Sequence, residues 1–312
     1  MELKGQSMHN LELINTSIQT AATISEAEAA RINESLRSNG IAVIKGFIGQ
    51  AQLSELQRDA IESLQDGFDA GAAISASIKM AISESTAEFK HPFLISKVAV
   101  ELAINSSLIR LIEAYLGNEA IIHHALFQRS IPINEPAVDW HVDTGSHKVL
   151  NGSKRFPDRR LRMIVYLTDV KSGGLSYIPD SLDAATCFLG LPQGTLYPQS
   201  DVSSRLYKRV TINEGAGTVI LFDAHGLHRP EPPRDSRIVL NIWFARSDFS
   251  ASLPPVLVSV ASVPKSQLNA AYIFGNERGE RVNQASGTQN AQIPLLKRLV
   301  LKLATWKKND SK

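Results

Sequence analysis

The residues of this sequence that could do chemistry together are two histidines, an aspartate and an arginine. His141-Val142-Asp143 sets an imidazole and a carboxylate two positions apart, and on an extended strand residues i and i+2 point to the same face. His228 follows a glycine-led apolar stretch, and Arg237 begins the next apolar stretch nine positions later. Two imidazoles and one carboxylate form a facial triad that leaves three adjacent positions open on an octahedral metal, which suits non-haem Fe(II) and O₂ chemistry.

Two positions in the sequence could supply the second histidine of this set. His225 and His228 both follow the apolar stretch, separated by Gly226 and Leu227. The apolar neighbour at Leu227 and the nine-residue spacing to Arg237 favour His228 as the metal ligand. In that interpretation His225 belongs to the turn before the ligand, where it is exposed or contacts a ligand indirectly.

Together these residues resemble the Fe(II)/2-oxoglutarate-dependent oxygenases, and within them the phytanoyl-CoA dioxygenase-like branch. The resemblance covers the C-terminal two thirds of the chain, through Trp140-His-Val-Asp143, Tyr166-Leu-Thr-Asp-Val170 leading to Gly173-Gly-Leu-Ser-Tyr-Ile-Pro179-Asp-Ser181, and His228 with Arg237. The middle segment normally ends in Gly-Ser-His, and Pro179-Asp-Ser-Leu182 departs from that pattern. The departure removes a histidine near the substrate mouth and leaves the iron ligands untouched.

The resemblance implies an enzyme with a double-stranded β-helix that holds iron at its open end. His141, Asp143 and His228 would ligate Fe(II), and Arg237 would form a bidentate ion pair with the distal carboxylate of 2-oxoglutarate. The implied cofactors are Fe(II), 2-oxoglutarate and O₂, with ascorbate needed in vitro. Related halogenases lack the carboxylate ligand, so Asp143 favours hydroxylation. Further contacts to the cofactor are expected from polar residues on neighbouring strands, namely Gln128, Tyr166 and Asn241.

The part of the chain before residue 120 is expected to be mainly helical. Ser25-Glu-Ala-Glu28 is a capping box, which predicts a helix from there to Gly40. Pattern analysis predicts three more elements, namely a strand over 41–47 and helices over 51–64 and 98–116. Residues 66–85 are rich in Gly, Ala and Ser, and we interpret them as a loop or a weak helix.

From residue 120 the pattern changes to short strands separated by turn residues. The expected strands cover 121–131, 139–143, 161–167, 175–178, 195–197, 218–222 and 237–244. The predicted fold class is therefore α+β, a jelly-roll or cupin-like double-stranded β-helix with packed N-terminal helices and a C-terminal helix. We expect a mainly helical part over 1–119 that belongs to the same domain as the catalytic core over 120–250, and an extension over 251–312 with a basic amphipathic helix.

Composition and charge restrict the class of protein. The 312 residues include one cysteine, so no intramolecular disulfide or cysteine-based metal cluster is expected. The sequence has no secretory signal pattern and no run of about 18 apolar residues. The net charge of +2 divides into +5 after Pro294 and −3 for the rest. A mildly acidic body argues against a nucleic-acid demethylase and against any nucleic-acid partner.

Basic residues close to the HxD motif indicate an anionic substrate. They follow the motif directly and are rich in arginine, which binds carboxylates and phosphates well; those assigned to substrate binding are Lys148, Arg159, Arg160 and Arg162. The alternative is an ordinary solvated face.

The C-terminal residues 294–308 form an amphipathic pattern with apolar residues, flanking lysines and Trp306. Such a helix either lies on a membrane surface or docks its apolar face on the body of the protein. The two alternatives stay open from the sequence.

The substrate hypothesis combines these features. We expect a cytoplasmic enzyme, which is peripheral on the inner face of the membrane if the C-terminal helix binds there. The expected substrate is an inner-core sugar of lipopolysaccharide such as Kdo, because the size, the HxD motif and the basic tail are similar to those of a Kdo hydroxylase. No protein partner is expected. The alternatives are a hydroxylase of a soluble small metabolite or an acyl-CoA, and a non-catalytic β-barrel binding module, which would have no need of the triad.

Overall fold

The computed structural model describes residues 14–15, 23–64, 81–82, 86–143, 160–179, 181, 196–197, 208–248, 256 and 273–274. The chain divides into two units, 1–276 and 277–312. The second unit contains the predicted C-terminal helix and lies outside the described residues, so the description below concerns the first. In the described part of the chain, no helix has both the length and the hydropathy to cross a membrane.

The described residues form five α-helices, all of which precede the first long strand. They are α1 (Glu26–Asn39), α2 (Gln50–Leu64), α3 (Pro92–Ile95), α4 (Lys97–Ala103) and α5 (Ser106–Leu116). The predicted capping box begins α1: the Ser25 hydroxyl accepts from the Glu28 amide at 3.3 Å, and the Glu28 carboxylate accepts from the Ser25 amide at 2.9 Å. Gly40 ends this helix with a left-handed φ of 75°, a conformation that glycine adopts without steric cost.

The single helix predicted over 98–116 is wrong, because the structure divides it into α4 and α5. Asn105 stands between them as the N-cap of α5, and its side chain accepts from the amides of Ser107 and Leu108 at 3.1 Å. An asparagine that caps the following turn competes with continuation of the preceding helix.

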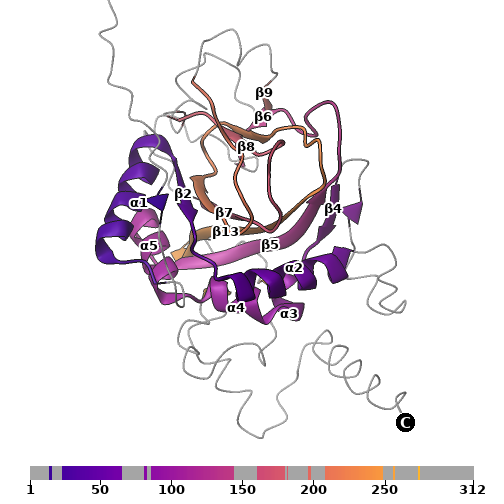
Figure 1. Ribbon diagram of the computed structural model, residues 1–312. Helices are drawn as coiled ribbons and strands as arrows, with labels where there is room; N and C mark the ends of the chain where they lie inside the picture. The colour runs from indigo at the N-terminus through magenta and orange to yellow at the C-terminus, as the bar shows by residue number, and fades with distance from the viewer. Residues whose placement is uncertain are drawn as a thin grey trace, which may run out of the picture. The chain divides into compact units, whose positions relative to one another are not determined.

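The strands form two sheets, which makes the fold α+β (Figure 1). The larger sheet has the order β1 (Ile14–Asn15), β2 (Ile41–Lys45), β11 (Val219–Asp223), β7 (Arg160–Tyr166), β13 (Arg237–Arg246), β5 (Ala120–Ser130), β4 (Thr86–Phe89) and β3 (Ala81–Ile82). The smaller sheet has the order β10 (Val210–Ile212), β8 (Leu175–Tyr177), β12 (His228–Pro230), β6 (Trp140–His141) and β9 (Leu196–Tyr197). The short strands β3 and β4 were not predicted; β3 falls within the stretch interpreted as a loop or a weak helix.

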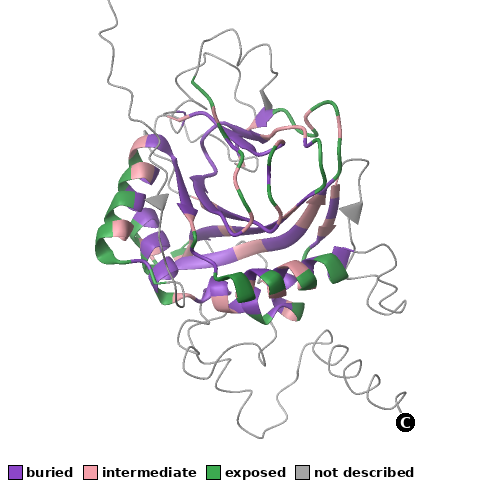
Figure 2. Ribbon diagram, viewed as in Figure 1, coloured by how far each residue is buried: buried purple, intermediate pink, exposed green. Residues whose placement is uncertain are grey.

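The larger sheet has a different core on each face. Leu240, Ile242 and Phe244 of β13 belong to the core that includes the buried residues of the helices. Val239, on the opposite face of the same strand, packs with Tyr177 of the smaller sheet. Figure 2 shows the strands of the larger sheet mostly buried and exposed residues along the outer sides of α1 and α2. Side chains that alternate along β13 therefore face either the helices or the smaller sheet.

Residues on both sides of the predicted boundary at 119/120 share one core. Leu36 of α1, Leu116 of α5 and Leu240 of β13 belong to the same buried cluster. From the predicted C-terminal extension, Phe274 joins this cluster and packs edge to face on Phe93 of α3, with ring centroids 5.2 Å apart. The helical part is thus packed on the sheet that carries the site.

The face of the larger sheet that points to the smaller one carries a row of polar side chains. Strand register sets Trp243 of β13 opposite Arg162 of β7 on one side and His124 of β5 on the other. The same register sets Arg237 opposite Ser130. This polar row lies between the two sheets and forms one wall of the candidate site.

Candidate metal centre

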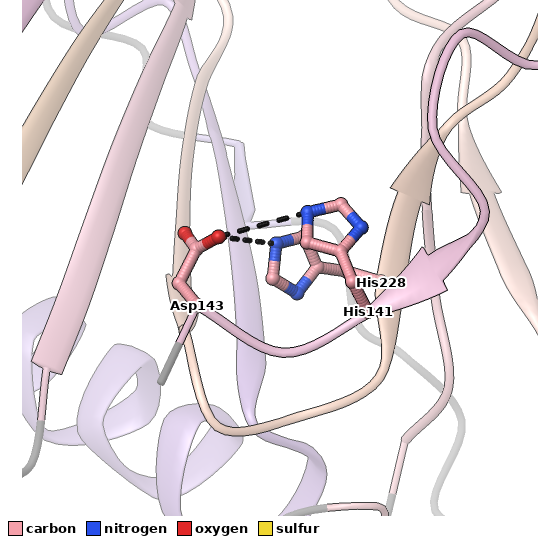
Figure 3. Close-up of side chains that lie close together, drawn as sticks. All are labelled: His141, Asp143 and His228. Carbon is pink, nitrogen blue, oxygen red and sulfur yellow. Dashed lines mark ion pairs between the residues drawn. The ribbon is translucent and has the colours of Figure 1, made fainter. Parts of the chain in front are cut away.

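The structure brings His141, Asp143 and His228 together (Figure 3). His141 on β6 and His228 on β12 are direct partners in the antiparallel pairing of the smaller sheet, and Asp143 follows β6 after one residue. Oδ1 of Asp143 lies 3.6 Å from Nε2 of each histidine. The three ligand atoms lie within 4.8 Å of one another. These are the residues that the HxD spacing and the downstream histidine predicted.

Backbone carbonyls orient both imidazole rings. Nδ1 of His141 lies 2.9 Å from the carbonyl oxygen of Asp139, and Nδ1 of His228 lies 2.9 Å from that of Gly226. Because a carbonyl oxygen only accepts, Nδ1 must donate in each ring, and in a neutral ring this tautomer has its lone pair on Nε2. A hydrogen bond of this kind is the usual support for a metal-binding histidine.

The donor set fits a divalent metal. His228 is 1% exposed, and its Nε2 has no hydrogen-bond partner in the described part of the chain. A buried acceptor without a partner is costly, and a metal ion would satisfy it. Metal–nitrogen bonds of about 2.1 Å place neighbouring octahedral ligands about 3 Å apart, so the observed 3.6 Å needs only a small contraction. Burial lowers the pKa of His141 to about 4, which keeps its lone pair available at neutral pH.

Asp143 is held in its charged form by its surroundings. Burial opposes ionisation, but Arg162 and the two histidines hold the pKa of the Asp143 carboxyl well below its ordinary value. Oδ2 accepts from Nη1 of Arg162 at 3.0 Å and from Nε1 of Trp243 at 3.2 Å. Arg162, which we predicted as a substrate-binding residue, is therefore paired with the carboxylate of the metal cluster.

His225 lies outside the metal cluster. Its Nδ1 is 2.9 Å from Oδ1 of Asp223, whose other oxygen accepts from the Tyr115 hydroxyl at 2.6 Å. All three groups are buried. Of the two histidines that the sequence left open, His228 is the one that faces His141 and Asp143, and His225 belongs to a buried polar group in the turn before it.

This turn also supports the cluster through its backbone. The carbonyl of Ala224 accepts from the Asp143 amide at 2.8 Å, and the carbonyl of Asp223 accepts from the Tyr177 hydroxyl at 3.2 Å. A Cβ atom on Gly226 would collide with that same hydroxyl. The close approach of Tyr177 therefore requires glycine here, and Gly226 carries the carbonyl that orients His228.

Arg237 is a buried cation on the inner face of β13. It is 7% exposed, and it donates to the Ser130 hydroxyl at 3.2 Å and to the carbonyl of Gly173. Its Nε has no partner in the described part of the chain, where no carboxylate pairs with it. Burial lowers the pKa of Arg237, yet an arginine stays protonated in proteins. An uncompensated buried guanidinium is costly unless an anion binds there.

The other predicted cofactor-binding residues are engaged with protein groups. The Asn241 amide donates to the Gln128 side chain at 3.2 Å, and Gln128 donates to Glu88 at 3.2 Å. The Tyr166 hydroxyl donates to the Ile212 carbonyl at 2.8 Å and accepts from the Leu175 amide at 3.0 Å. Gln128 and Asn241 thus belong to the polar row of the larger sheet, whereas the Tyr166 hydroxyl joins β8 and β10.

The predicted basic substrate site is only partly described. Lys148 and Arg159 lie outside the described residues, and Arg160 is half-buried at the start of β7. Sequence reasoning missed Trp243 and Glu88 as members of the polar row. Only the register of β13 and β4 with β5 places them there, and alternation along one strand does not reveal that register.

Comparison with known proteins is consistent with this geometry. The family model described as phytanoyl-CoA dioxygenase (PhyH) matches residues 36–239, which is more than half of the chain and contains the three clustered residues and Arg237. A search of the curated proteins finds no match.

Solved structures show the same fold. A crystal structure of EctD from S. alaskensis with 2-oxoglutarate and 5-hydroxyectoine has a TM-score of 0.56 and 21% sequence identity, covering 82% of this chain and 86% of that chain. One of the epimerase SnoN with Fe3+, alpha ketoglutarate and nogalamycin RO has a TM-score of 0.52 and 15% identity, covering 72% and 85%. The two-sheet α+β architecture resembles the double-stranded β-helix expected from the sequence.

Proposed function

Since the chain belongs to the phytanoyl-CoA dioxygenase family, we propose that His141, Asp143 and His228 hold Fe(II) and that the protein hydroxylates a C–H bond of a small molecule. The protein is an Fe(II)/2-oxoglutarate-dependent dioxygenase, so the non-catalytic binding module considered above is excluded. With O₂, bound Fe(II) and 2-oxoglutarate supply the oxidation that inserts one oxygen atom into the substrate, while 2-oxoglutarate becomes succinate and CO₂.

The observation that carries this proposal is the cluster of two histidines and one carboxylate, which would bind a metal ion from one side. Both Nε2 atoms and Oδ1 of Asp143 converge, and such a set leaves three adjacent positions on an octahedral metal for cofactor and O₂. Asp143 occupies the position that a halide takes in related halogenases. The carboxylate therefore supports hydroxylation as the reaction type.

Arg237 is the proposed partner of the distal carboxylate of 2-oxoglutarate. Its buried guanidinium has no carboxylate partner among the described residues, and a guanidinium binds a carboxylate through two parallel hydrogen bonds. The Ser130 hydroxyl, 3.2 Å from Nη2, adds a second polar group at this site. Gln128 and Asn241 would then act by ordering the neighbouring wall, since they already bind each other.

A soluble small molecule is the substrate class that we propose. The solved EctD structure contains 5-hydroxyectoine, and the SnoN structure contains nogalamycin RO, both of them small molecules. The lipopolysaccharide hypothesis depended on Lys148, Arg159 and residues 294–308, which lie outside the described residues. It also depended on Arg162, whose charge is paired with Asp143. The glycolipid substrate and the membrane contact stay predictions.

The test is turnover of 2-oxoglutarate by the purified full chain. The protein is loaded anaerobically with Fe(II), given 2-oxoglutarate, ascorbate and air, and assayed for succinate with and without pooled soluble metabolites. We expect slow succinate formation alone, faster formation with a substrate pool, and a substrate product heavier by one oxygen. Absence of both metal binding and succinate would overturn the proposal.

A further inference from the structure

The two oxygens of Asp143 have different partners. Oδ1 faces the two histidines, at 3.6 Å from each Nε2. Oδ2 points the other way and accepts two hydrogen bonds, at 3.0 Å from Arg162 and at 3.2 Å from Trp243. Both donors lie on the larger sheet, whereas Asp143 follows a strand of the smaller one. The carboxylate is thus fixed across the gap between the two sheets.

The Arg162 guanidinium is itself held in place. Its Cζ lies 4.1 Å from the ring centroid of Trp243 and 5.7 Å from that of Phe222. These aromatic residues are its direct partners on the two neighbouring strands. Nη2 reaches the Asn241 side chain at 3.5 Å, and the Arg162 side chain is 15% exposed. Arg162 therefore presents its guanidinium to Asp143 in a fixed orientation.

We propose that Arg162 and Trp243 form a clamp on Oδ2 that keeps Asp143 a one-oxygen ligand of the metal. The inference rests on the proposed metal site and concerns how three coordination positions of the metal stay free of protein ligands. A carboxylate free to turn can give both oxygens to one metal ion. It would then occupy a fourth position and leave two open positions in place of three. With Oδ2 engaged by two donors, only Oδ1 is available.

The orienting role of Arg162 and the effect of its charge on metal binding have opposite signs, so they can be told apart. A guanidinium this close to a metal site repels a dication, so charge alone would make Arg162 weaken metal binding. Groups that orient metal ligands act in the opposite direction, and their loss typically costs about 10–100-fold in metal affinity. Trp243 donates a hydrogen bond without carrying charge. Its removal therefore tests the hydrogen bond without changing the net charge at the site.

The experiment uses Mn(II) and the full chain without 2-oxoglutarate. The variants are Trp243→Phe, which removes the N–H donor and keeps a ring against Arg162, and Arg162→Met, which keeps an unbranched side chain without the donors. Arg246→Met is the matched control, because Arg246 ends β13 three residues after Trp243 and forms an ion pair with Asp248, which is not one of the clustered residues. Affinity comes from the EPR signal of free Mn(II), and water-proton relaxivity per bound ion reports the number of coordinated waters.

We expect both clamp variants to bind Mn(II) about tenfold or more weakly. We also expect lower relaxivity per bound ion, as the water positions fall from three to two. Arg246→Met should match the unmodified protein. Unchanged affinity and relaxivity in Trp243→Phe would overturn the clamp, as would tighter binding by Arg162→Met with Trp243→Phe unchanged. If the unmodified protein binds no Mn(II), Co(II) or Fe(II), the proposed metal site itself fails. Thermal unfolding checks that each variant is folded.

Discussion

His141 and His228 lie directly opposite each other on the antiparallel strands β6 and β12, with ring centroids 4.3 Å apart. The pairing of these strands therefore brings together residues that are distant in the sequence. Opposed side chains on one face of an antiparallel pair are the closest cross-strand neighbours. Asp143 joins them because it lies two residues after His141 and its amide donates a hydrogen bond to the carbonyl of Ala224, in the turn that precedes His228.

Replacement of each histidine in turn tests the choice of ligand. We expect His228→Ala to lose measurable Fe(II) or Mn(II) binding, because Nε2 of His228 faces Asp143. His225→Ala should keep binding with a smaller loss, because the His225 ring is bonded to Asp223. Metal titration of both variants is the measurement. Retained binding in the first and lost binding in the second would reverse the assignment.

Arg237→Met tests the proposed carboxylate site. Loss of one partner of a buried charged pair costs about 2–5 kcal/mol, or about 30-fold or more in 2-oxoglutarate affinity. Metal affinity should stay unchanged, which makes it the internal control, and Arg246→Met should bind 2-oxoglutarate normally. The unloaded variant should be at least as heat-stable as the unmodified protein, because a buried charge without a carboxylate partner is costly. Equal 2-oxoglutarate affinity would contradict this assignment.

Asp223→Asn tests the buried group formed with Tyr115 and His225. Burial opposes ionisation of Asp223, but hydrogen bonds from His225 and Tyr115 hold the pKa of its carboxyl below the ordinary value. The ionised form is therefore favoured in the folded protein. Its contribution to stability is present above the unfolded-state pKa and is lost as the pH falls through the folded-state pKa.

The expected loss for Asp223→Asn is about 2 kcal/mol at pH 7, the scale of hydrogen bonds to a charged group. The difference between variant and unmodified protein should shrink under acid conditions, because the unmodified carboxyl is then protonated as well. Urea unfolding at neutral and acid pH measures both values. A difference that stays constant with pH would show that the charge on Asp223 contributes nothing.

The HxD pair of the metal cluster was predictable because its information is local, and His228 was favoured from its own sequence neighbours. The spacing of His141 and Asp143 fixes a shared face on any strand, and Leu227 with the distance to Arg237 was enough to favour His228. The capping box at Ser25 was likewise predicted correctly from residues close in sequence.

The role of Arg162 was not predictable, because its partners come from other strands. In the sequence it belongs to a basic run, which suggested substrate binding. Only the register that pairs Arg162 with Trp243 and Phe222 turns it toward Asp143. The strand β4, which lies between β5 and the edge strand β3, was missed for a related reason: its four residues pair with β5 and are too few for alternation to identify them.

We expect Gly226→Ala to lower both the stability of the protein and its affinity for the metal. The added methyl group would meet the Tyr177 hydroxyl, and overpacking of this kind costs about 1–3 kcal/mol of stability. Displacement of the Gly226 carbonyl would also disturb the hydrogen bond that orients His228, so we expect about tenfold weaker metal binding. Tyr177→Phe removes the colliding oxygen, and the double variant should therefore recover part of both losses. If the double variant shows the sum of the two single effects, the collision with the Tyr177 hydroxyl is not what requires glycine at this position.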